Sequence, residues 1–88
     1  MYKKDKNHKA VSDIFKYFGW TIIDTSWSRG KLLDIIIYKS RREFWFVEIK
    51  DDKKTLTPNE VWFFNKHLER SQLIRSIEEA KAWCINRQ

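Results

Sequence analysis

Residues 32–50 of the chain read LLDIIIYKSRREFWFVEIK and hold two apolar runs on either side of a short polar turn. β-Branched and aromatic residues dominate both runs, which predicts a strand over residues 32–39, a turn over 40–43 and a strand over 44–50. Neither strand alternates cleanly between apolar and polar side chains. We therefore expect both strands to lie in the middle of a sheet that is covered on both faces.

The residues before this hairpin predict a helix and one further strand. Apolar side chains recur at helical spacing between about residues 7 and 18, with Asp5 or Asn7 available as the N-cap. Gly19 follows the last of them, where a helix commonly ends in the left-handed region. Residues 20–25 are rich in β-branched side chains and predict a strand, which a turn at residues 28–31 joins to the hairpin.

The residues after the hairpin predict a loop over 51–56 and a second helix. Thr57, Pro58 and Glu60 have the pattern of an N-cap, a first helical residue and a capping-box acid. This helix is expected to bury one apolar face, made of Val61, Phe64 and Leu68.

A short strand over about residues 72–75 and a last helix complete the pattern. Ser76 and Glu79 form a second capping-box pair at the start of that helix. Its buried side is expected to contain Ile77, Ala80, Trp83 and Cys84. The order αβββαβα, with a mixed sheet flanked by helices, indicates an α/β fold, and 88 residues suffice for a single domain, residues 1–88.

Charge and cysteine content limit the functions to consider. The formal net charge is +6 and the isoelectric point is near 9.6, which favours a polyanionic partner, nucleic acid before an anionic membrane. Cys84 is the single cysteine, so neither an internal disulfide nor a cysteine-based zinc site can form within one chain. The apolar stretches are too short to cross a membrane, and we expect a cytoplasmic protein with no membrane partner.

Three charged residues fall on the predicted central strands. The two-residue period of a strand places Asp34 on one face of the first, and both Glu48 and Lys50 on one face of the second. Strands joined by a tight turn are neighbours, so we expect two carboxylates and an ammonium group to cluster on an otherwise apolar sheet. An isolated charge there would be costly, so such groups persist where they pair, reach solvent or bind a ligand.

Two chemical interpretations of this cluster follow. Two acids and a main-chain carbonyl, here that of Ile49, offer the hard oxygen ligands that Mg²⁺ prefers. A neighbouring lysine could orient or deprotonate a water beside such a metal, or stabilise the extra negative charge of a phosphoryl transition state. The alternative is structural: Asp34 or Glu48 forms a salt bridge with Lys50 at the strand ends.

The same residues carry a resemblance to a known family. Asp34 followed by Glu48-Ile49-Lys50 is similar to the split Asp…Glu-x-Lys signature of the PD-(D/E)XK nuclease superfamily. The motifs around it resemble, in order, the stand-alone virus-type replication-repair nuclease (VRR-NUC) domains of phages and bacteria: Asp5-x-Asn7-His8, Gly19, Leu33-Asp34-Ile35-Ile36, Val47-Glu48-Ile49-Lys50-Asp51 and Leu56-Thr57-Pro58-x-Glu60. The likeness extends to the segment Ile74–Ala80.

This resemblance implies a restriction-endonuclease-like core and a metal-dependent deoxyribonuclease. Asp34 and Glu48, with the carbonyl of Ile49, would bind Mg²⁺ or Mn²⁺, and Lys50 would be the catalytic lysine. Small members of the family are associated with structure-specific cleavage of DNA, such as Holliday junctions and flaps, and with pairing of two protomers. The chain would then be phage-encoded or bacterial and act as a homodimer in a bacterial cytoplasm.

Three positions in these motifs depart from the family pattern. A proline commonly precedes the aspartate, and Leu33 stands here instead, which still allows an extended strand. Many superfamily members carry a glutamate on the first helix, and the corresponding residue here is His8. His8 could bind a metal, contact phosphate or be a solvated residue at the helix end, which is the interpretation that we favour. Glu60 stands where related domains often have glutamine, and we favour its capping-box role over a role in the site. Asp5 and Asn7 belong to the same motif as His8 and are candidates for supporting the site.

Lysines and arginines gather in the predicted loops. Lys53 and Lys54 follow Lys50 closely and are expected to contact DNA phosphates, which would make affinity depend on salt. His8 and Lys9, in the basic segment that leads into the first helix, are further candidates for DNA contact. We assign most of the other basic residues, including the arginines of the hairpin turns, to solvation.

Aromatic residues are more numerous than one small core needs. Trp27, Trp45, Trp62 and Phe63 fall outside the predicted buried helix faces. Trp62 and Phe63 are expected to cover a second sheet element or a partner protomer, which we favour over stacking on unpaired bases.

Two functions compete with the nuclease. One is a catalytically inactive nucleic-acid-binding module that keeps the nuclease fold, with His8 as the altered residue. The other is a structural or inhibitory phage protein whose charges only pair with one another. Metal binding and metal-dependent turnover separate these three.

Overall fold

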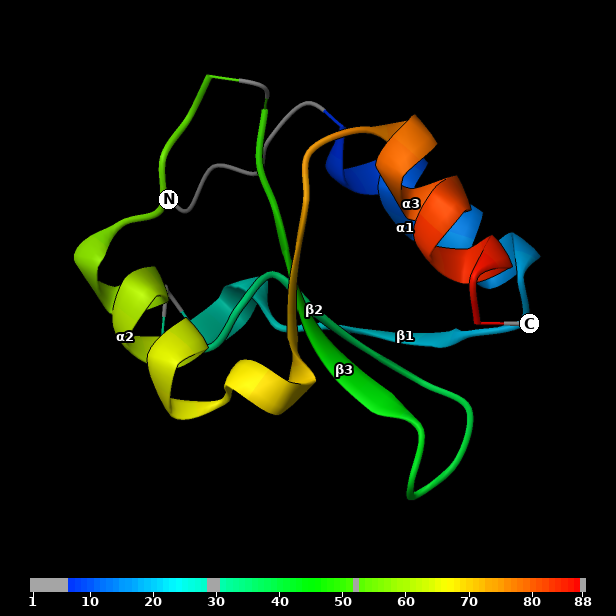
Figure 1. Cartoon of the computed structure of the whole chain (residues 1–88), viewed down its shortest axis with the longest axis horizontal. Coiled ribbons are helices and arrows are strands. Elements are labelled where there is room, and N and C mark those ends of the chain that lie inside the picture. Colours follow the sequence, from blue (N-terminus) through cyan, green and yellow to red (C-terminus); the bar gives the residue numbers. More distant parts are fainter. Residues whose placement is uncertain (1–6, 29–30, 52, 88) are drawn as a thin grey trace.

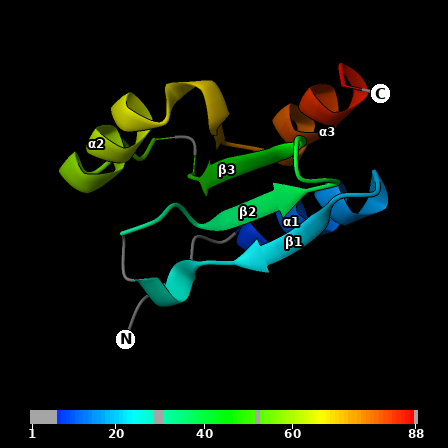
Figure 2. The ribbon, with the colours of Figure 1, turned by 90° about the horizontal axis from the view of Figure 1, so that it is seen from below.

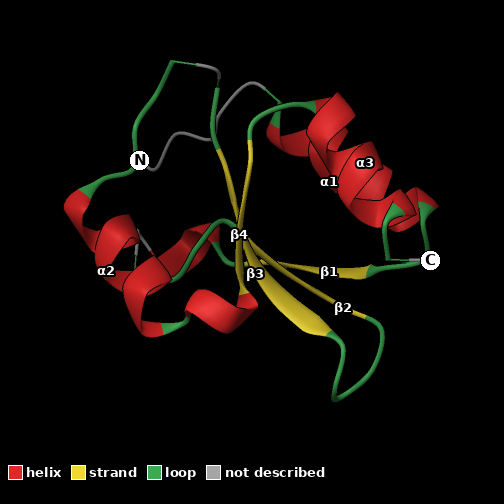
Figure 3. Ribbon diagram, in the orientation of Figure 1, coloured by secondary structure: helices red, strands yellow, loops and turns green. Residues whose placement is uncertain are grey.

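The computed structural model describes residues 7–28, 31–51 and 53–87 of the chain. Within these ranges the α-helices and strands follow one another in the predicted order, with two short 3₁₀ helices in addition (Figure 3). Their bounds are α1 (His8–Tyr17), β1 (Thr21–Asp24), η1 (Ser26–Ser28), β2 (Ile35–Tyr38), β3 (Phe44–Ile49), α2 (Pro58–Lys66), η2 (Leu68–Arg70), β4 (Ser71–Ile74) and α3 (Ile77–Ile85). The chain therefore has an α/β fold.

The four strands form one mixed sheet in the order β1-β2-β3-β4. β2 pairs antiparallel with both β1 and β3, whereas β3 and β4 are parallel. A parallel pair needs a crossover connection, and α2 lies in that connection (Figure 2). β2 and β3 are the central strands, as their apolar runs predict, although β2 is shorter than predicted and begins at Ile35.

α1 and α3 pack against each other and cover one face of the sheet (Figure 1). Ile35 lies opposite Val47 in the β2–β3 register, so their side chains share that face. Apolar side chains of the strands and of both helices form a single cluster there: Val11, Phe15, Trp20, Ile35, Ile37, Val47, Ile49, Ile74, Ala80, Trp83 and Cys84. This cluster is the core of the molecule.

α2 covers part of the opposite face. Phe46 alternates with Val47 and therefore points away from the core, where its ring lies 5.0 Å from the ring of Phe63. The predicted inward face of this helix is wrong, because Val61 is 43% exposed and Leu68 is 70% exposed. The inward positions are Glu60 and Phe63, and Leu68 falls beyond the end of the helix, in η2.

Trp20 and Trp83 are part of the core, and the half-buried Trp45 packs against it. The ring of Trp83 lies 5.3 Å from that of Trp20 and 5.5 Å from that of Trp45. The expectation that Trp45 is surplus to the core is therefore wrong, since a strand side chain of this size reaches the α3 face. Trp27 and Trp62 are 72% and 58% exposed, in line with the surplus that the sequence suggests.

The helix ends agree with the sequence only in part. Thr57 and Glu60 form the predicted capping box of α2. At α3 the Ser76 hydroxyl accepts the Glu79 N–H, but the Glu79 carboxylate accepts the N–H of Arg75 and not that of Ser76. Ile77, expected to be buried, is half-buried.

The start of α1 also differs from the prediction. Asn7 occupies the N-cap position, but its side chain makes no capping hydrogen bond and donates instead to the carbonyl of Arg75, 3.1 Å away. Asp5, the other predicted cap, lies outside the described residues, as do Arg29 and Gly30 of the first turn. No helix in the described part of the chain is long and apolar enough to cross a membrane.

Gly19 provides a test of the turn between α1 and β1. Its φ of +90° lies in the left-handed region, as predicted, and the nearest atom to an added Cβ would be Lys39 Cε at 3.9 Å. A Gly19→Ala variant is therefore expected to lose about 1–2 kcal/mol of unfolding free energy through backbone strain alone. Urea denaturation measures the loss. Gly19→Asn should lose less, because asparagine tolerates this region, and equal losses in the two variants would contradict the explanation.

Candidate active site

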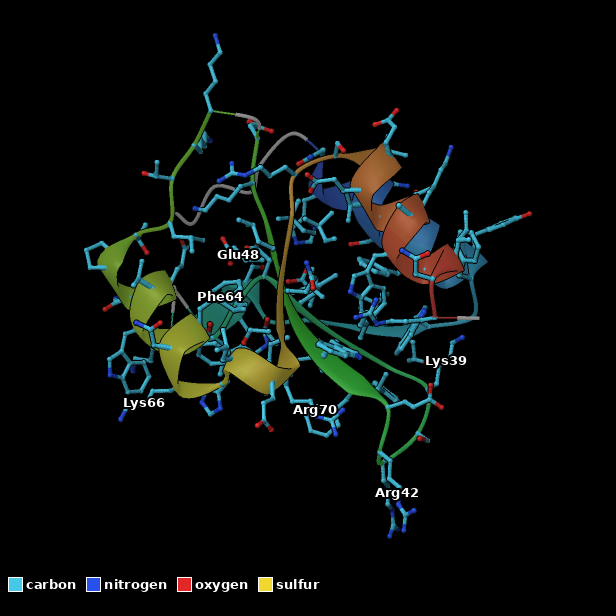
Figure 4. The ribbon with its side chains drawn as sticks, in the orientation of Figure 1. Lys39, Arg42, Glu48, Phe64, Lys66 and Arg70 are labelled. Carbon is cyan, nitrogen blue, oxygen red and sulfur yellow. The ribbon has the colours of Figure 1, made fainter. Side chains whose placement is uncertain are left out.

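Four charged side chains are buried at one end of the sheet. Asp34, Glu48, Lys50 and Glu60 are 6%, 2%, 9% and 4% exposed, respectively. Figure 4 places Glu48 in the interior, between β3 and α2. Charged groups are rarely buried to this extent unless they are paired or bind a ligand.

Asp34 is held at the entrance to β2 by two neighbouring strands. Its Oδ2 accepts the backbone N–H of Ile49 at 2.8 Å, which fixes the carboxylate beside the end of β3. Its own carbonyl accepts the N–H of Thr25 at 2.9 Å, and the Thr25 hydroxyl donates to the carbonyl of Leu33. Backbone and side-chain hydrogen bonds thus fix Leu33 and Asp34 just before Ile35, where the regular strand begins.

Lys50 lies between two glutamates. Its Nζ is 3.0 Å from Oε1 of Glu60 and 3.5 Å from Oε2 of Glu48. The same Oε1 of Glu60 accepts the N–H of Thr57 at 2.8 Å as part of the capping box. Glu60 therefore forms the predicted capping box of α2 and also contacts Lys50, whereas its role in a site stays a prediction.

The pKa values of the two glutamates in this cluster are shifted in opposite directions. Burial, hydrogen bonding with Glu60 and the charges of Asp34 and Glu60 together raise the pKa of Glu48 to about 9, against a smaller lowering effect of Lys50. Although burial raises the pKa of Glu60, its hydrogen bonds with Glu48, Thr57 and Lys50 outweigh this and hold the pKa below its usual value. In the metal-free protein these opposite pKa shifts favour the protonated form of Glu48 and the ionised form of Glu60.

The two glutamates also determine the charge of Lys50. Burial lowers the pKa of this lysine, but hydrogen bonding and charge interactions with Glu60 and Glu48 outweigh it and give a net increase. The ammonium group is therefore charged at neutral pH. It is suited to stabilising negative charge, and in this state it is not suited to accepting a proton.

The oxygen atoms around Glu48 suit a hard divalent cation. In a strand the N–H and the C=O of one residue point to the same side, so the Ile49 carbonyl faces the side on which its N–H meets Asp34. A carboxylate offers about four acceptor positions on its two oxygens, so the hydrogen bonds of Asp34 and Glu48 still permit ligation. Within the described ranges, no group of three or more His, Cys, Asp and Glu side chains is arranged to hold a metal ion. The candidate set instead combines two carboxylates with a main-chain carbonyl.

The histidine and lysine at the start of α1 lie in different environments. His8 is 7% exposed, so the favoured expectation of a solvated residue is wrong. Its Nε2 and the Ser12 hydroxyl, one turn further along, are buried without a hydrogen-bond partner among the described residues. Lys9 points to solvent and pairs with Asp13 at 2.8 Å. The roles of His8, Lys9 and Asn7 in binding DNA or supporting the site remain predictions.

The loop after Lys50 is tied to the end of β4. Arg75 Nη1 donates to the carbonyls of Asp51 and Lys54, at 2.9 and 2.7 Å. Lys53 and Lys54 are exposed on this loop and line an open pocket of about 600 Å³ next to the start of α3. This placement is compatible with the phosphate contact predicted for both lysines, which stays a prediction.

Comparison with protein-family models, with curated proteins and with solved structures found no match. The resemblance to VRR-NUC domains thus rests on the motifs in the sequence.

Two residues that hold this site in place were missed by the sequence analysis. The sequence analysis placed Thr25 and Arg75 in predicted strands and assigned neither of them a contact with the site. Both act on residues distant in the chain, Thr25 on Leu33 and Arg75 on Asp51. A local pattern carries no signal for such contacts.

Removing the Thr25 hydroxyl tests how Asp34 is positioned. Thr25→Val keeps the shape of the side chain but leaves the buried Leu33 carbonyl without its donor, which is expected to cost about 1–3 kcal/mol of unfolding free energy. Thr21→Val, at an exposed position of β1, is the matched control and should be close to neutral. Urea denaturation compares the two. A Thr25→Val variant as stable as the control would show that this hydrogen bond does not stabilise the fold.

The protonation of Glu48 makes a second prediction, on stability without metal. The folded protein holds this proton up to about pH 9, whereas the unfolded chain loses it near the ordinary value of 4.5. The contribution of Glu48 to stability is therefore fully present below the ordinary pKa and is lost as pH rises toward the folded pKa. In EDTA, Glu48→Gln should flatten the fall in unfolding free energy between about pH 5 and about pH 9.

The exposed position Glu78 supplies the control for this experiment. Glu78→Gln removes a carboxylate from the first turn of α3 without touching the cluster. It should retain the pH dependence of the wild type. A Glu48→Gln profile with the wild-type slope would show that Glu48 is ionised in the folded protein.

Proposed function

We propose that this protein is a metal-dependent DNA endonuclease with a restriction-endonuclease-like core. The observation that carries the proposal is the meeting of Asp34, Glu48 and Lys50 at one end of the sheet. Asp34 comes from one part of the split sequence motif, Glu48 and Lys50 come from the other, and all three are buried. Burial of three ionisable groups in a domain of 88 residues is expensive, and a functional site would explain why they are retained.

Asp34, Glu48 and the carbonyl of Ile49 would hold Mg²⁺ or Mn²⁺ in this proposal. When bound, the divalent ion supplies a Lewis acid that polarises a phosphoryl oxygen. The N–H of Ile49 orients the Asp34 carboxylate, and Glu48 gives up its proton before it can serve as a ligand.

Lys50 would stabilise the negative charge that develops on the phosphate. Its Nζ is fixed between Glu48 and Glu60, so little reorganisation is needed when the charge appears. The raised pKa favours this role over the removal of a proton from water. Glu60 acts through Lys50 and is a positioning residue.

Branched DNA, such as a Holliday junction or a flap, is the proposed substrate, and a homodimer is the proposed active form. Both come from the family resemblance. The exposed Trp27 and Trp62 are the candidates for covering a partner protomer. A bacterial cytoplasm, reached as a phage or a host protein, is the proposed location.

The proposal is tested by cleavage of labelled four-way junction, flap, duplex and single-stranded DNA, with Mg²⁺, Mn²⁺ or EDTA. The wild type is expected to cut branched DNA fastest, and only with metal. Lys50→Ala should lower kcat by about 100- to 1,000-fold, the usual effect of losing one stabilising donor. Lys50→Arg should retain more activity than Lys50→Ala, because arginine keeps the positive charge but does not accept a proton.

Controls and alternative outcomes separate the competing functions. Lys16→Ala, at an exposed position of α1, should cut like the wild type. Circular dichroism confirms that each variant is folded. Tight binding of DNA without cleavage under either metal would favour the inactive binding module. A Lys50→Ala variant that cuts at the wild-type rate would refute the assigned site.

A further inference from the structure

A second charged region lies at the opposite end of β3 from Lys50. Five cations surround the turn that joins β2 to β3, and we call them the hairpin patch: Lys39, Arg41, Arg42, Arg70 and Arg87. Arg41 and Arg42 are exposed at the tip of the turn. Figure 4 shows Arg42 at this tip with Arg70 beside it, pointing away from the interior that holds Glu48.

Arg70 is fixed on the side of the sheet that α2 covers. Its guanidinium lies 4.6 Å from the centre of the Phe44 ring. Its Nη1 donates to the carbonyl of Arg42 at 3.0 Å and to that of Phe44 at 3.4 Å. The arginine is thus held against the base of the hairpin by a ring and by neutral carbonyls.

Arg87 and Lys39 are fixed on the other side of the sheet. The guanidinium of Arg87 lies 4.0 Å from the Trp83 ring centre and 4.9 Å from that of Trp45. The ammonium group of Lys39 lies 4.8 Å from the Trp20 ring centre. Aromatic rings orient these cations without neutralising them.

The charge of the hairpin patch is not compensated by ion pairs. None of the five cations lies within ion-pair distance of a carboxylate in the residues that the structure describes, Glu43 of the same turn included. Elsewhere the lysines do pair, as Lys9 does with Asp13 and Lys54 with Asp51. A cluster of unpaired, partly fixed cations is the electrostatic feature that nucleic-acid-binding surfaces share.

We propose that the hairpin patch binds the phosphate backbone of DNA at a distance from the cleavage site. The identity of the ligand rests on the proposed nuclease function. From Glu43 to Lys50 the extended chain rises about 23 Å, at about 3.3 Å per residue. At about 3.4 Å per base pair, this corresponds to about seven base pairs of duplex. A duplex that lies along β3 therefore reaches both ends.

The residues beneath the patch favour nucleic acid over a lipid surface. Trp20 and Trp83, on which Lys39 and Arg87 lie, are only 4% and 7% exposed. They are therefore not free to insert into a bilayer, as interfacial tryptophans do. Arginine also presents a planar fork that matches phosphate oxygens. Because Arg70 and Arg87 are already held in place, less side-chain entropy is lost when they bind.

The test measures the salt dependence of DNA binding without catalysis. Fluorescence anisotropy in EDTA gives the affinity of each variant for a labelled duplex of about 16 base pairs, long enough to pass both ends of β3. Arg41→Gln/Arg42→Gln is expected to reduce the slope of log K against log salt by about 1.8, for two lost phosphate contacts. The backbone carbonyl of Arg42 that holds Arg70 is unchanged in this variant.

The matched control removes two exposed lysines from the outer surfaces of α1 and α3. Lys16→Gln/Lys81→Gln has the same loss of charge as the patch variant and should keep the wild-type slope. Equal reductions in both double variants would show a net-charge effect and overturn the proposal. So would an unchanged slope in the patch variant, or binding to phosphatidylserine vesicles that needs Arg41 and Arg42 while binding to DNA does not.

These results can be told apart from failure of the nuclease itself. A wild type that binds DNA with the patch-dependent slope but cuts nothing would refute the nuclease and support the patch. A wild type that cuts branched DNA, while the patch variant binds like the control, would support the nuclease and refute the patch.

Discussion

The fold and the candidate site both depend on the contacts of the Glu60 carboxylate. One of its oxygens accepts the N–H of Thr57 and lies 3.0 Å from the ammonium group of Lys50. The first contact starts α2, and the second ties that start to the end of β3. Because Glu60 must face the sheet to reach Lys50, Phe63, three residues later, also faces it and packs on Phe46. The side of α2 that faces the sheet thus carries both a charge contact, at Glu60, and an aromatic contact, at Phe63.

The burial of these four ionisable groups costs less free energy because the raised pKa of Glu48 favours its neutral form. Glu48 is neutral while its pKa stays near 9, and the charge of Glu60 is balanced by that of Lys50. Asp34 receives the N–H of Ile49. Without metal the cluster therefore resembles a buried ion pair beside a neutral acid, a much cheaper arrangement than two adjacent carboxylates.

The sequence predicted what local rules control and missed what distant contacts control. The two-residue period placed Asp34 with Glu48, and the capping pattern located the start of α2, because both follow from the nearest few residues. The inward face of α2 was misassigned because it depends on Lys50, in another element. Asn7 and Glu79 were given local capping roles, yet both turn to the backbone of Arg75. The burial of His8 likewise depends on packing that its polar neighbours do not reveal.

The acidic side chains lie at one end of β3, and the unpaired cations of the hairpin patch lie near the other end. Ionised carboxylates at the end of the strand repel a phosphate backbone, so attraction has to come from elsewhere on the molecule. The proton on Glu48 and the ammonium group of Lys50 reduce this repulsion locally. The uncompensated cations lie at the other end of the strand, close to the turn. In the proposed nuclease, cations that lie apart from the carboxylates would let DNA binding and metal ligation use different groups.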